Sequence, residues 1–520
     1  MKSPREYGLP EKYERWRPVQ VAALDMLSRR SKRTTGICAP TGSGKSGIVI
    51  AHAIESGKPT CIVTATKGLQ DQYLLDGKDA GMVDIRGRAN YKCNMRPDDP
   101  EWTCEDGFAS GCPYKGSVNC DCSQAEIAAA SSNLVVTNYS KWYNSKKFGL
   151  GWDHIQQVVF DEGDEAPAAL ADAMQVFLYH REIERDLELD FPGPPENQSF
   201  AIWKAWSYVA KAKAEEATNI AKARITGVAN PKPSWVKHFN HMKNLMRRLA
   251  ILVTACPEDW VVDEKPEGWQ FDPVRPARYA EGALLFRTPN IILVSATLRP
   301  KTMNMLGMSK DHFEFKEFDS DFDPARCPIY YVPTMRVDSR AENLDMLWMR
   351  IDQVVAKRQD RKGLIDTVSY ARRDAITSTS RFAHRMIINE RGEPTVEALT
   401  QYREAGPGAI LVSPVFGRGY DFPRKDCEWI IMCKIPFEPP SKIVKAREAL
   451  DREYRSYQAM QKMVQTFGRG MRSKDDRCEC MIFDDHMQWF LPRYGHLAPK
   501  SFHRIFKQVD VLPQPPERLV

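Results

Sequence analysis

The sequence lacks any long hydrophobic run and any apolar segment at its start. Its longest apolar stretches, such as residues 291–294 and 409–412, are far shorter than the ~18 residues that a membrane-spanning helix needs. The first six residues are partly charged, and no apolar signal-peptide core follows them. We therefore expect no membrane segment and a cytoplasmic location.

The sequence also lacks a strong excess of either charge. Lys and Arg number 74 and Asp and Glu 68, a difference of +6, which permits a polyanionic partner without requiring one. Hydrophobic residues at 42% and charged residues at 27% are near the averages of globular chains, which excludes wholesale disorder. A length of 520 residues is enough for several domains.

Short β-rich runs alternate with helix-like stretches along the chain, as in parallel sheets covered by helices. The expected strands lie at residues 34–39, 60–66, 156–161 and 291–295 in the first half, and at 363–368, 409–413, 429–434 and 480–484 in the second. This pattern predicts an α/β protein with two sheets. Residues 201–223 and 238–252, between the two expected strands that end at 161 and 295, are predicted helices.

A phosphate-binding loop is the strongest functional signal. Residues 39–46 read Ala-Pro-Thr-Gly-Ser-Gly-Lys-Ser between a predicted strand and an apolar helix. The backbone N–H groups of such a loop face phosphates, its lysine reaches the β- and γ-phosphate oxygens, and its serine ligates magnesium. The predicted loop residues are Thr41, Gly42, Ser43, Gly44, Lys45 and Ser46.

Two further segments carry groups that phosphoryl transfer requires. Asp161 and Glu162 follow an apolar strand, where one carboxylate can hold magnesium through water and the other can orient the attacking water. Arg469 and Arg472 are three residues apart in the second half, a spacing that predicts one helical face. Two such guanidinium groups can stabilise negative charge on a transferring phosphoryl group.

Cysteine is sparse except in one segment. Five of the 13 cysteines lie within residues 93–122, which is too dense for chance. Four thiolates hold either a zinc ion or a [4Fe–4S] cluster. Structural zinc sites generally draw ligands from Cys pairs with two to four residues between them, and this segment has no such pair, which weakens zinc without excluding it. These cysteines are Cys93, Cys104, Cys112, Cys120 and Cys122.

The motifs, in their order along the chain, resemble those of the XPD/DinG branch of superfamily 2 helicases. After the phosphate loop come residues 64–72, 161–164, 295–297, 369–370, 417–421 and 465–472, and residues 17–20 precede it. The resemblance implies two RecA-like motor domains that bind ATP and Mg²⁺ between them. It assigns adenine recognition to Gln20, further nucleotide contacts to Asp421 and Gln465, and magnesium to Ser46 and Asp161.

The resemblance also favours iron and sulfur over zinc. Residues 87–93 resemble the entry into the family's cluster domain, and the spacing after Cys120 matches that after the final ligand. The implied [4Fe–4S] ligands are Cys93, Cys104, Cys112 and Cys120, with Cys122 as the alternate.

The resemblance further implies six segments. The first motor domain comprises residues 1–87, 123–166 and 258–326, interrupted by a cluster domain at 88–122 and a helical Arch-like insertion at 167–257; residues 327–520 form the second. Together the insertions would form a pore for one strand, in which Trp203, Trp206, Tyr208, Trp235 and Phe239 either stack on bases or form the core.

The predicted function is an ATP-dependent DNA helicase that moves 5′ to 3′ on single-stranded DNA and opens forked or tailed duplexes as a monomer. A bacterial cytoplasm or a phage-infected host fits this compact form. The alternatives are a motor on RNA or duplex DNA that unwinds little, and a clamp or scaffold gated by ATP.

The sequence departs from the family pattern at two positions. Asp164 stands where the family usually has a histidine that couples hydrolysis to strand movement, and Arg418 stands where it generally has Glu. These departures concern coupling more than hydrolysis.

Overall fold

The structure is a computed structural model of the whole chain. It describes residues 2–147, 152–193, 199–228, 230–338, 344–391, 395–416, 420, 422, 424–473 and 475–516. All statements below on structure refer to these residues.

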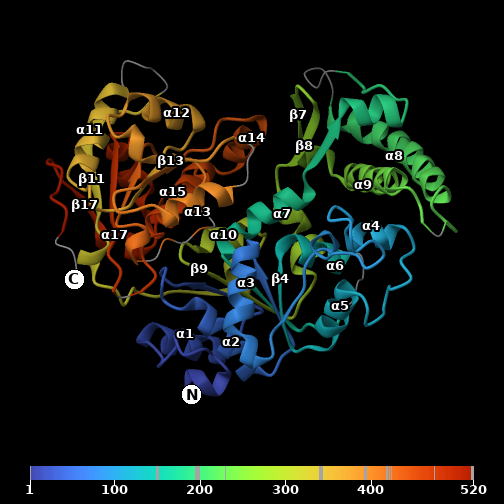
Figure 1. Cartoon of the computed structure of the whole chain (residues 1–520), viewed down its shortest axis with the longest axis horizontal. Coiled ribbons are helices and arrows are strands. Elements are labelled where there is room, and N and C mark those ends of the chain that lie inside the picture. Colours follow the sequence, from blue (N-terminus) through green and yellow to red (C-terminus); the bar gives the residue numbers. More distant parts are fainter. Residues whose placement is uncertain are drawn as a thin grey trace.

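Two parallel sheets form the centres of two lobes (Figure 1). In the described residues each has seven strands, in the orders β10-β1-β9-β5-β2-β4-β3 and β13-β14-β12-β15-β16-β11-β17. The first contains β1 (Thr34–Cys38), β2 (Thr60–Thr64), β3 (Val83–Asp84), β4 (Leu134–Asn138), β5 (Gln157–Asp161), β9 (Asn290–Ser295) and β10 (Phe313–Glu317). The second contains β11 (Ile329–Met335), β12 (Gly363–Asp366), β13 (Met386–Ile388), β14 (Ile410–Ser413), β15 (Trp429–Met432), β16 (Glu479–Asp484) and β17 (Phe506–Gln508).

Helices cover both sheets, which confirms the predicted two-domain α/β fold. The first lobe and its insertions carry α1 (Pro18–Arg29), α2 (Lys45–Ser56), α3 (Lys67–Asp76), α4 (Cys104–Ala109), α5 (Asp121–Ser131), α6 (Tyr139–Lys147), α7 (Ala166–Met174), α8 (Phe200–Ala223), α9 (Pro233–Thr254) and α10 (Pro300–Met305). The second carries α11 (Leu344–Ala356), α12 (Tyr370–Thr379), α13 (Thr395–Glu404), α14 (Lys442–Leu450), α15 (Tyr454–Phe467), α16 (Met487–Tyr494) and α17 (Lys500–Ile505).

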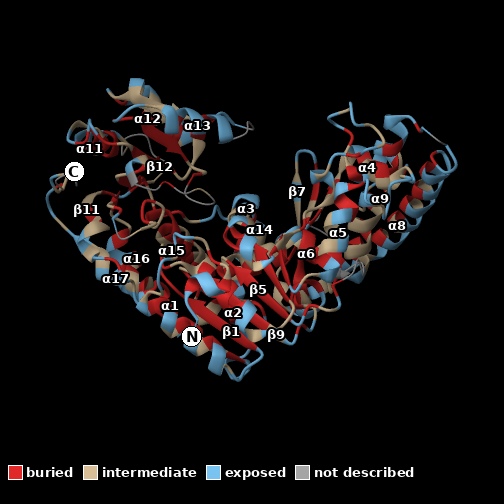
Figure 2. Cartoon of the chain, turned by 60° about the horizontal axis from the view of Figure 1, so that its bottom comes forward, coloured by how far each residue is buried: buried red, intermediate tan, exposed pale blue. Residues whose placement is uncertain are grey.

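The central strands are buried along their whole length. Every residue of β1, β2, β5, β12, β14, β15 and β16 is buried, and Figure 2 shows the red strands inside each lobe. A parallel strand with helices on both faces reads as a continuous apolar run, which is why these strands could be recognised in the sequence. Their carboxyl ends carry the polar residues of the motifs, as is usual in open α/β sheets.

A separate layer projects from the first lobe between β5 and β9. Helices α8 and α9 pack against each other and against an antiparallel sheet of β6 (Val176–Tyr179), β8 (Gly268–Pro273) and β7 (Trp260–Lys265). Both helices were expected from the sequence, whereas the small sheet was not. The sequence places the end of this insertion at residue 257, and in the structure β7 and β8 continue its sheet to residue 273.

The cysteine-rich segment packs onto that projecting layer (Figure 1). Cys93 and Trp102 share a buried apolar cluster with Val236 and Phe239 of α9. Polar contacts also join the two parts: Arg96 binds the Pro231 carbonyl at 2.8 Å. The two insertions therefore support each other although more than 100 residues separate them.

A search of the described helices for one both long and apolar enough to cross a bilayer finds none.

Candidate functional site

The predicted phosphate loop connects β1 to α2. Gly42 and Gly44 have φ of +76° and +77°, a backbone conformation that side chains disfavour. Helix α2 begins at Lys45, so its first N–H groups and its positive dipole end lie at the loop. The Lys45 side chain folds back over the loop, with its ammonium 3.5 Å from the Ala39 carbonyl. This geometry fits a bound phosphate chain.

The segment before α1 contacts the same loop. Arg17 donates to the Gly42 carbonyl at 2.6 Å, and the Gln20 amide lies 3.4 Å from the Gly44 carbonyl. The Arg17 backbone N–H in turn donates to Gln20 at 2.8 Å, which fixes the glutamine side chain. The sequence motif thus brings Gln20 to the phosphate loop.

The predicted magnesium ligands lie around a tyrosine that no sequence motif indicates. The Tyr73 hydroxyl, from α3, is buried between Ser46 and Asp161. Burial and the neighbouring Glu162 raise the pKa of Asp161 to about 7, and Lys45 opposes that shift. A divalent cation here would favour the ionised carboxylate, so the donor set fits magnesium.

Glu162 follows β5 in a strained backbone conformation. Its φ is +47°, and non-glycine residues held in this region are concentrated at functional sites. A side chain at Gly163 would collide with Leu293 of β9, which explains glycine at this position. The Ser295 hydroxyl donates to the Glu162 carboxylate at 3.0 Å and so fixes its direction.

The second lobe meets the phosphate loop through the segment after α15. A Cβ on Gly468 would lie 2.8 Å from the Thr41 hydroxyl, and one on Gly42 3.0 Å from the Arg472 carbonyl. The expectation that Arg469 and Arg472 share a helical face is wrong, because α15 ends at Phe467. The glycine-containing turn instead brings Gly468 and the Arg472 backbone to the junction between the lobes, and the Arg469 carbonyl accepts from the Phe422 N–H within the second lobe.

Asp164 accepts a hydrogen bond across this junction. It accepts hydrogen bonds of 2.6 Å from Thr297, which follows β9, and of 2.6 Å from Gln465 of α15. All three side chains are buried. Three separate motifs therefore meet at one carboxylate. The predicted nucleotide contact Asp421 lies outside the described residues.

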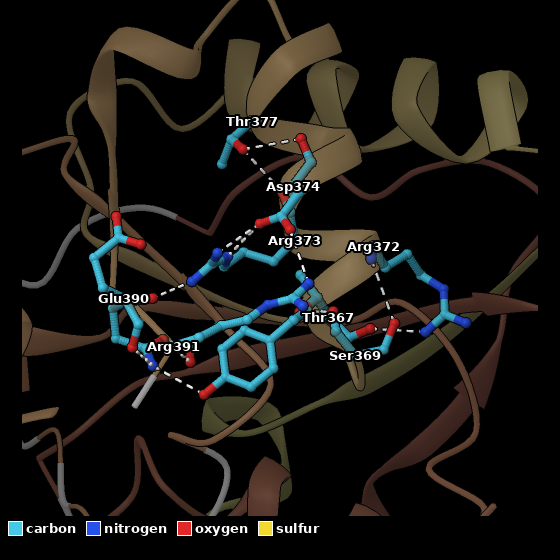
Figure 3. Close-up of polar contacts among 11 residues, drawn as sticks. Thr367, Ser369, Arg372, Arg373, Asp374, Thr377, Glu390 and Arg391 are labelled. Carbon is cyan, nitrogen blue, oxygen red and sulfur yellow. Dashed lines mark hydrogen bonds and ion pairs between the residues drawn. The ribbon is translucent and has the colours of Figure 1, made fainter. Parts of the chain in front are cut away.

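A polar cluster follows β12 in the second lobe, where the sequence indicated Ser369 and Tyr370. Figure 3 shows Arg373 and Arg391 converging on Asp374, with Arg391 at 3.1 Å. Two further contacts were not foreseen: Arg372 donates to the Thr367 carbonyl at 2.8 Å, and Asn389 lies 3.2 Å from the Tyr370 hydroxyl. The strained backbone of Val368, with a φ of +61°, was not foreseen either.

The five clustered cysteines come together in the fold as two groups. Cys104 lies against Cys120 and Cys122, and its hydrogen bond with Cys122, followed by burial, raises its pKa. Cys93 lies against Cys112, which also faces Cys120. Within the described ranges no three Cys, His, Asp or Glu side chains form a site for a single ion. A cluster whose sulfur ligands bind different irons suits this wider donor set.

An aromatic ring surrounded by cations lies where the two insertions meet. The Phe108 ring of α4 has the Arg88 guanidinium 3.8 Å and the Lys115 ammonium 4.4 Å from its centroid, and Lys243 of α9 approaches to 6.0 Å. Burial and the nearby Arg247 and Arg88 lower the pKa of Lys243, so positive charge is crowded here. We call Arg88, Phe108, Lys115 and Lys243 the cationic cluster.

The aromatic residues of α8 and α9 divide into core and surface. Trp203 and Phe239 are buried, and Trp203 packs on Trp269 with ring centroids 4.8 Å apart. Tyr208 and Trp235 are partly exposed. Trp203 and Phe239 therefore form part of the core of this helix pair and are not a stacking surface for bases.

Comparisons with known proteins agree with this geometry. A family model described as a helicase C-terminal domain matches residues 355–504. The XPD/RAD3 helicase subunit of the general transcription and DNA repair factor IIH of Saccharomyces cerevisiae is 38% identical over 110 residues, which cover 18% of this chain and 14% of that subunit.

Solved XPD structures share the fold over almost the whole chain. An XPD helicase superposes with a TM-score of 0.65 at 14% identity, covering 94% of this chain and 98% of that one. Xpd4 of S. tokodaii gives 0.56 at 14% identity, with 95% and 100% covered. At this identity the likeness shows the fold. Together with the order of the motifs and the matched C-terminal domain, it makes the chain similar to XPD/DinG-like helicases of superfamily 2.

Proposed function

We propose that the protein is an ATP-dependent DNA helicase that moves 5′ to 3′ along single-stranded DNA and separates forked or tailed duplexes. The proposal rests above all on the contact between the phosphate loop and the segment after α15, because nucleotide bound there touches both lobes at once. Hydrolysis that changes this contact also changes the positions of the two lobes along bound single-stranded DNA.

The nucleotide site has a role for each predicted residue. Lys45 and the loop Thr41–Ser46 hold the phosphates, with Ser46 and Asp161 at the magnesium ion. Glu162 orients the attacking water, and the Ser295 hydroxyl holds it in place. The remaining contacts are assigned to the adenine reader Gln20, to Asp421 and Gln465, and to the charge-stabilising Arg469 and Arg472.

The cysteine-rich segment fits a [4Fe–4S] cluster held by Cys93, Cys104, Cys112 and Cys120, with Cys122 as the alternate fourth ligand. When bound, the cluster supplies a rigid link among these thiolates. The chain's own residues would then hold Phe108 and Arg88 in a fixed position beside α9. Such a rigid element can separate the strands of an advancing duplex.

The cationic cluster is the proposed path of the single strand past the insertions. Cations track the phosphates of a strand, and an aromatic ring offers a stacking surface for bases. The polar cluster after β12 supplies a second set of arginines on the other lobe. Two binding regions on lobes that move relative to each other are what a translocating motor needs.

Strand separation with 5′-tailed, 3′-tailed and forked duplexes of DNA and of RNA tests this function, with iron and sulfide measured anaerobically in the same preparation. We expect ATP-dependent opening of 5′-tailed and forked DNA. Opening from a 3′ tail alone contradicts the polarity. Movement on RNA or duplex DNA with little opening supports the translocase alternative.

A clamp or scaffold gated by ATP makes a different prediction for the proposed water-orienting residue. If DNA leaves hydrolysis negligible and Glu162→Gln changes nothing, the protein binds nucleic acid without a hydrolysis-driven step. If the variant binds DNA and ATP but stops turnover, the motor is supported.

A further inference from the structure

Asp164 is the buried meeting point of the two lobes. Its Oδ2 atom accepts both the Thr297 hydroxyl and the Gln465 amide, each at 2.6 Å. Its side chain comes from the turn after β5, Thr297 from the end of β9, and Gln465 from α15 of the other lobe. A contact of this kind forms when the two lobes are correctly positioned against each other.

Two oxygen atoms at this point have no hydrogen-bond partner. They are Oδ1 of Asp164 and Oε1 of Gln465, and both are buried. Each is an acceptor, so neither can satisfy the other, and an unpaired buried acceptor is unfavourable. A proton on Oδ1 removes both deficits. The O–H group donates to Oε1 while the amide of Gln465 donates to Oδ2, which is the cyclic pairing of a carboxylic acid with a carboxamide.

The surrounding groups favour the protonated acid. On its own turn Asp164 faces the carboxylates Glu162 and Glu165, which disfavour a further negative charge. Groups facing it from other elements are Cys38 of β1, Tyr139 of α6 and Tyr457 of α15. Burial raises the pKa of each of these three, so they are neutral near pH 7 and offer Asp164 no positive charge.

The nearest cations are engaged elsewhere. Arg299, which faces Cys38 and Tyr457, pairs with Glu317 at 2.7 Å. Lys45 faces Asp161 at the phosphate loop. Burial, followed by the charges of Glu162 and Glu165, raises the pKa of Asp164 to about 7, while the nearby hydroxyl groups of Ser295 and Thr297 oppose that shift.

We propose that Asp164 is a positioning residue that acts as a neutral acid: protonated, it pairs with Gln465 across the junction and holds the water-orienting Glu162 in place. The inference rests on the proposed function, since it concerns the same site. The connection to Glu162 runs through hydroxyl groups, from Thr297 to Ser295 at 3.4 Å and from Ser295 to Glu162 at 3.0 Å.

Loss of the proton weakens this arrangement. With Oδ1 charged, neither Oδ1 nor Oε1 has a donor, so the pair keeps one hydrogen bond and two buried acceptors stay unpaired. The protonated state is populated below the pKa of Asp164 and lost as pH rises through it. DNA-stimulated hydrolysis therefore falls on the alkaline side, and the fall appears in kcat more than in the KM for ATP.

The test compares the pH dependence of ATP hydrolysis in the parent, Asp164→Asn, Asp164→Ala and the control Asp153→Asn, with and without single-stranded oligothymidine. Asn keeps the cyclic pairing without a titrating proton, since its amide donates to Oε1 and its carbonyl accepts. Asp153 is exposed, so its variant receives the same chemical change outside the site.

We expect DNA-stimulated kcat of the parent and of D153N to fall about tenfold per pH unit above the pKa of Asp164. In D164N we expect no alkaline decrease of kcat, whatever its maximal rate. In D164A we expect most of the stimulation by DNA to be lost at every pH. Glu165→Gln removes one negative neighbour and shifts the fall to lower pH.

Three results overturn the inference: a parent without the alkaline fall, a D164N variant that keeps it, or an E165Q variant in which its position is unchanged. If no form of the protein hydrolyses ATP with DNA, the proposed function itself fails. If the parent is stimulated by DNA but D164N behaves like the parent, only the role of Asp164 fails. A carbonyl stretch of a protonated acid, present in the parent and absent in D164N, checks the proton directly.

Discussion

The junction between the lobes and the cationic cluster between the insertions differ in the groups that surround their charged side chains. At the junction, the buried carboxylate of Asp164 accepts short hydrogen bonds from two other motifs, through Thr297 and Gln465. In the cationic cluster, Arg88, Lys115 and Lys243 crowd around Phe108. The junction brings hydrogen-bond donors to its carboxylates when the lobes meet, whereas the cluster gathers three cations around one ring, of which Arg88 pairs with Glu126 at 3.1 Å. We propose that the junction serves the chemistry and that the cluster holds a strand.

The largest expected effect at the junction follows from Glu162→Gln. Removing the group that orients the attacking water should lower kcat roughly 10²- to 10⁴-fold and leave ATP binding intact, because the phosphate loop is unchanged. Steady-state hydrolysis and fluorescent-nucleotide binding measure the two effects. Equal losses of binding and hydrolysis would show that Glu162 supports the fold of the loop instead.

The next effect tests the cysteine-rich segment. Cys104→Ser removes the thiol that lies against both Cys120 and Cys122, so we expect loss of bound iron and of strand separation. Hydrolysis without DNA should persist, because the junction is separate. Cys256→Ser, outside the segment, is the control and should retain iron. Iron in C104S equal to that in C256S would contradict the assignment.

The fourth ligand can be determined by the same measurement. We expect Cys120→Ser to lose iron and Cys122→Ser to retain it. The reverse pattern would make Cys122 the ligand and Cys120 the spare thiol.

A smaller effect is expected when the cationic cluster is weakened. Lys243→Ala should reduce affinity for single-stranded DNA and reduce the slope of log K against log salt by about 0.7, the value for one phosphate contact on a single strand. Lys265→Ala is the matched control, since Lys265 pairs with Asp263 at 2.6 Å on β7. An unchanged slope in K243A would place the strand elsewhere.

The smallest expected effect concerns stability. The pKa of Asp164 is raised on folding, so its contribution to stability is present at low pH and is lost as pH rises toward about 7. Asp164→Asn should therefore unfold at a higher temperature than the parent at alkaline pH, by about 2 °C, and lose this advantage at acidic pH. Thermal unfolding followed by circular dichroism at both pH values checks the sign, and a pH-independent difference would contradict it.

The sequence predicted the parts of the fold that depend on local pattern. The eight expected strands are present because fully buried parallel strands are continuous apolar runs with polar residues at their ends. Six strands of the two seven-stranded sheets were missed. β3, β13 and β17 have only two or three residues and carry no periodicity, whereas β4, β10 and β11 have five to seven residues and were not recognised. The small sheet was also missed: β7 and β8 are separated by only two residues, and β6 joins them from more than 80 residues earlier in the sequence.

The candidate site was predicted where a motif carries the chemistry. The phosphate loop and the acidic residues after β5 lie as the spacing indicated. Tyr73 and Phe108 were not foreseen, because their positions depend on packing between segments that no local pattern connects. The helical placement of Arg469 and Arg472 was wrong, since the close approach of Gly468 to Thr41 requires a turn.

The central claim is that ATP hydrolysis at the junction drives strand separation, and Lys45→Ala tests it most directly. Hydrolysis and opening of a 5′-tailed duplex are measured together for the parent, K45A and the exposed control Lys310→Ala. We expect K45A to lose both activities by at least about 100-fold while DNA affinity stays near that of the parent. Hydrolysis and opening in K45A at the parental rates would contradict the account.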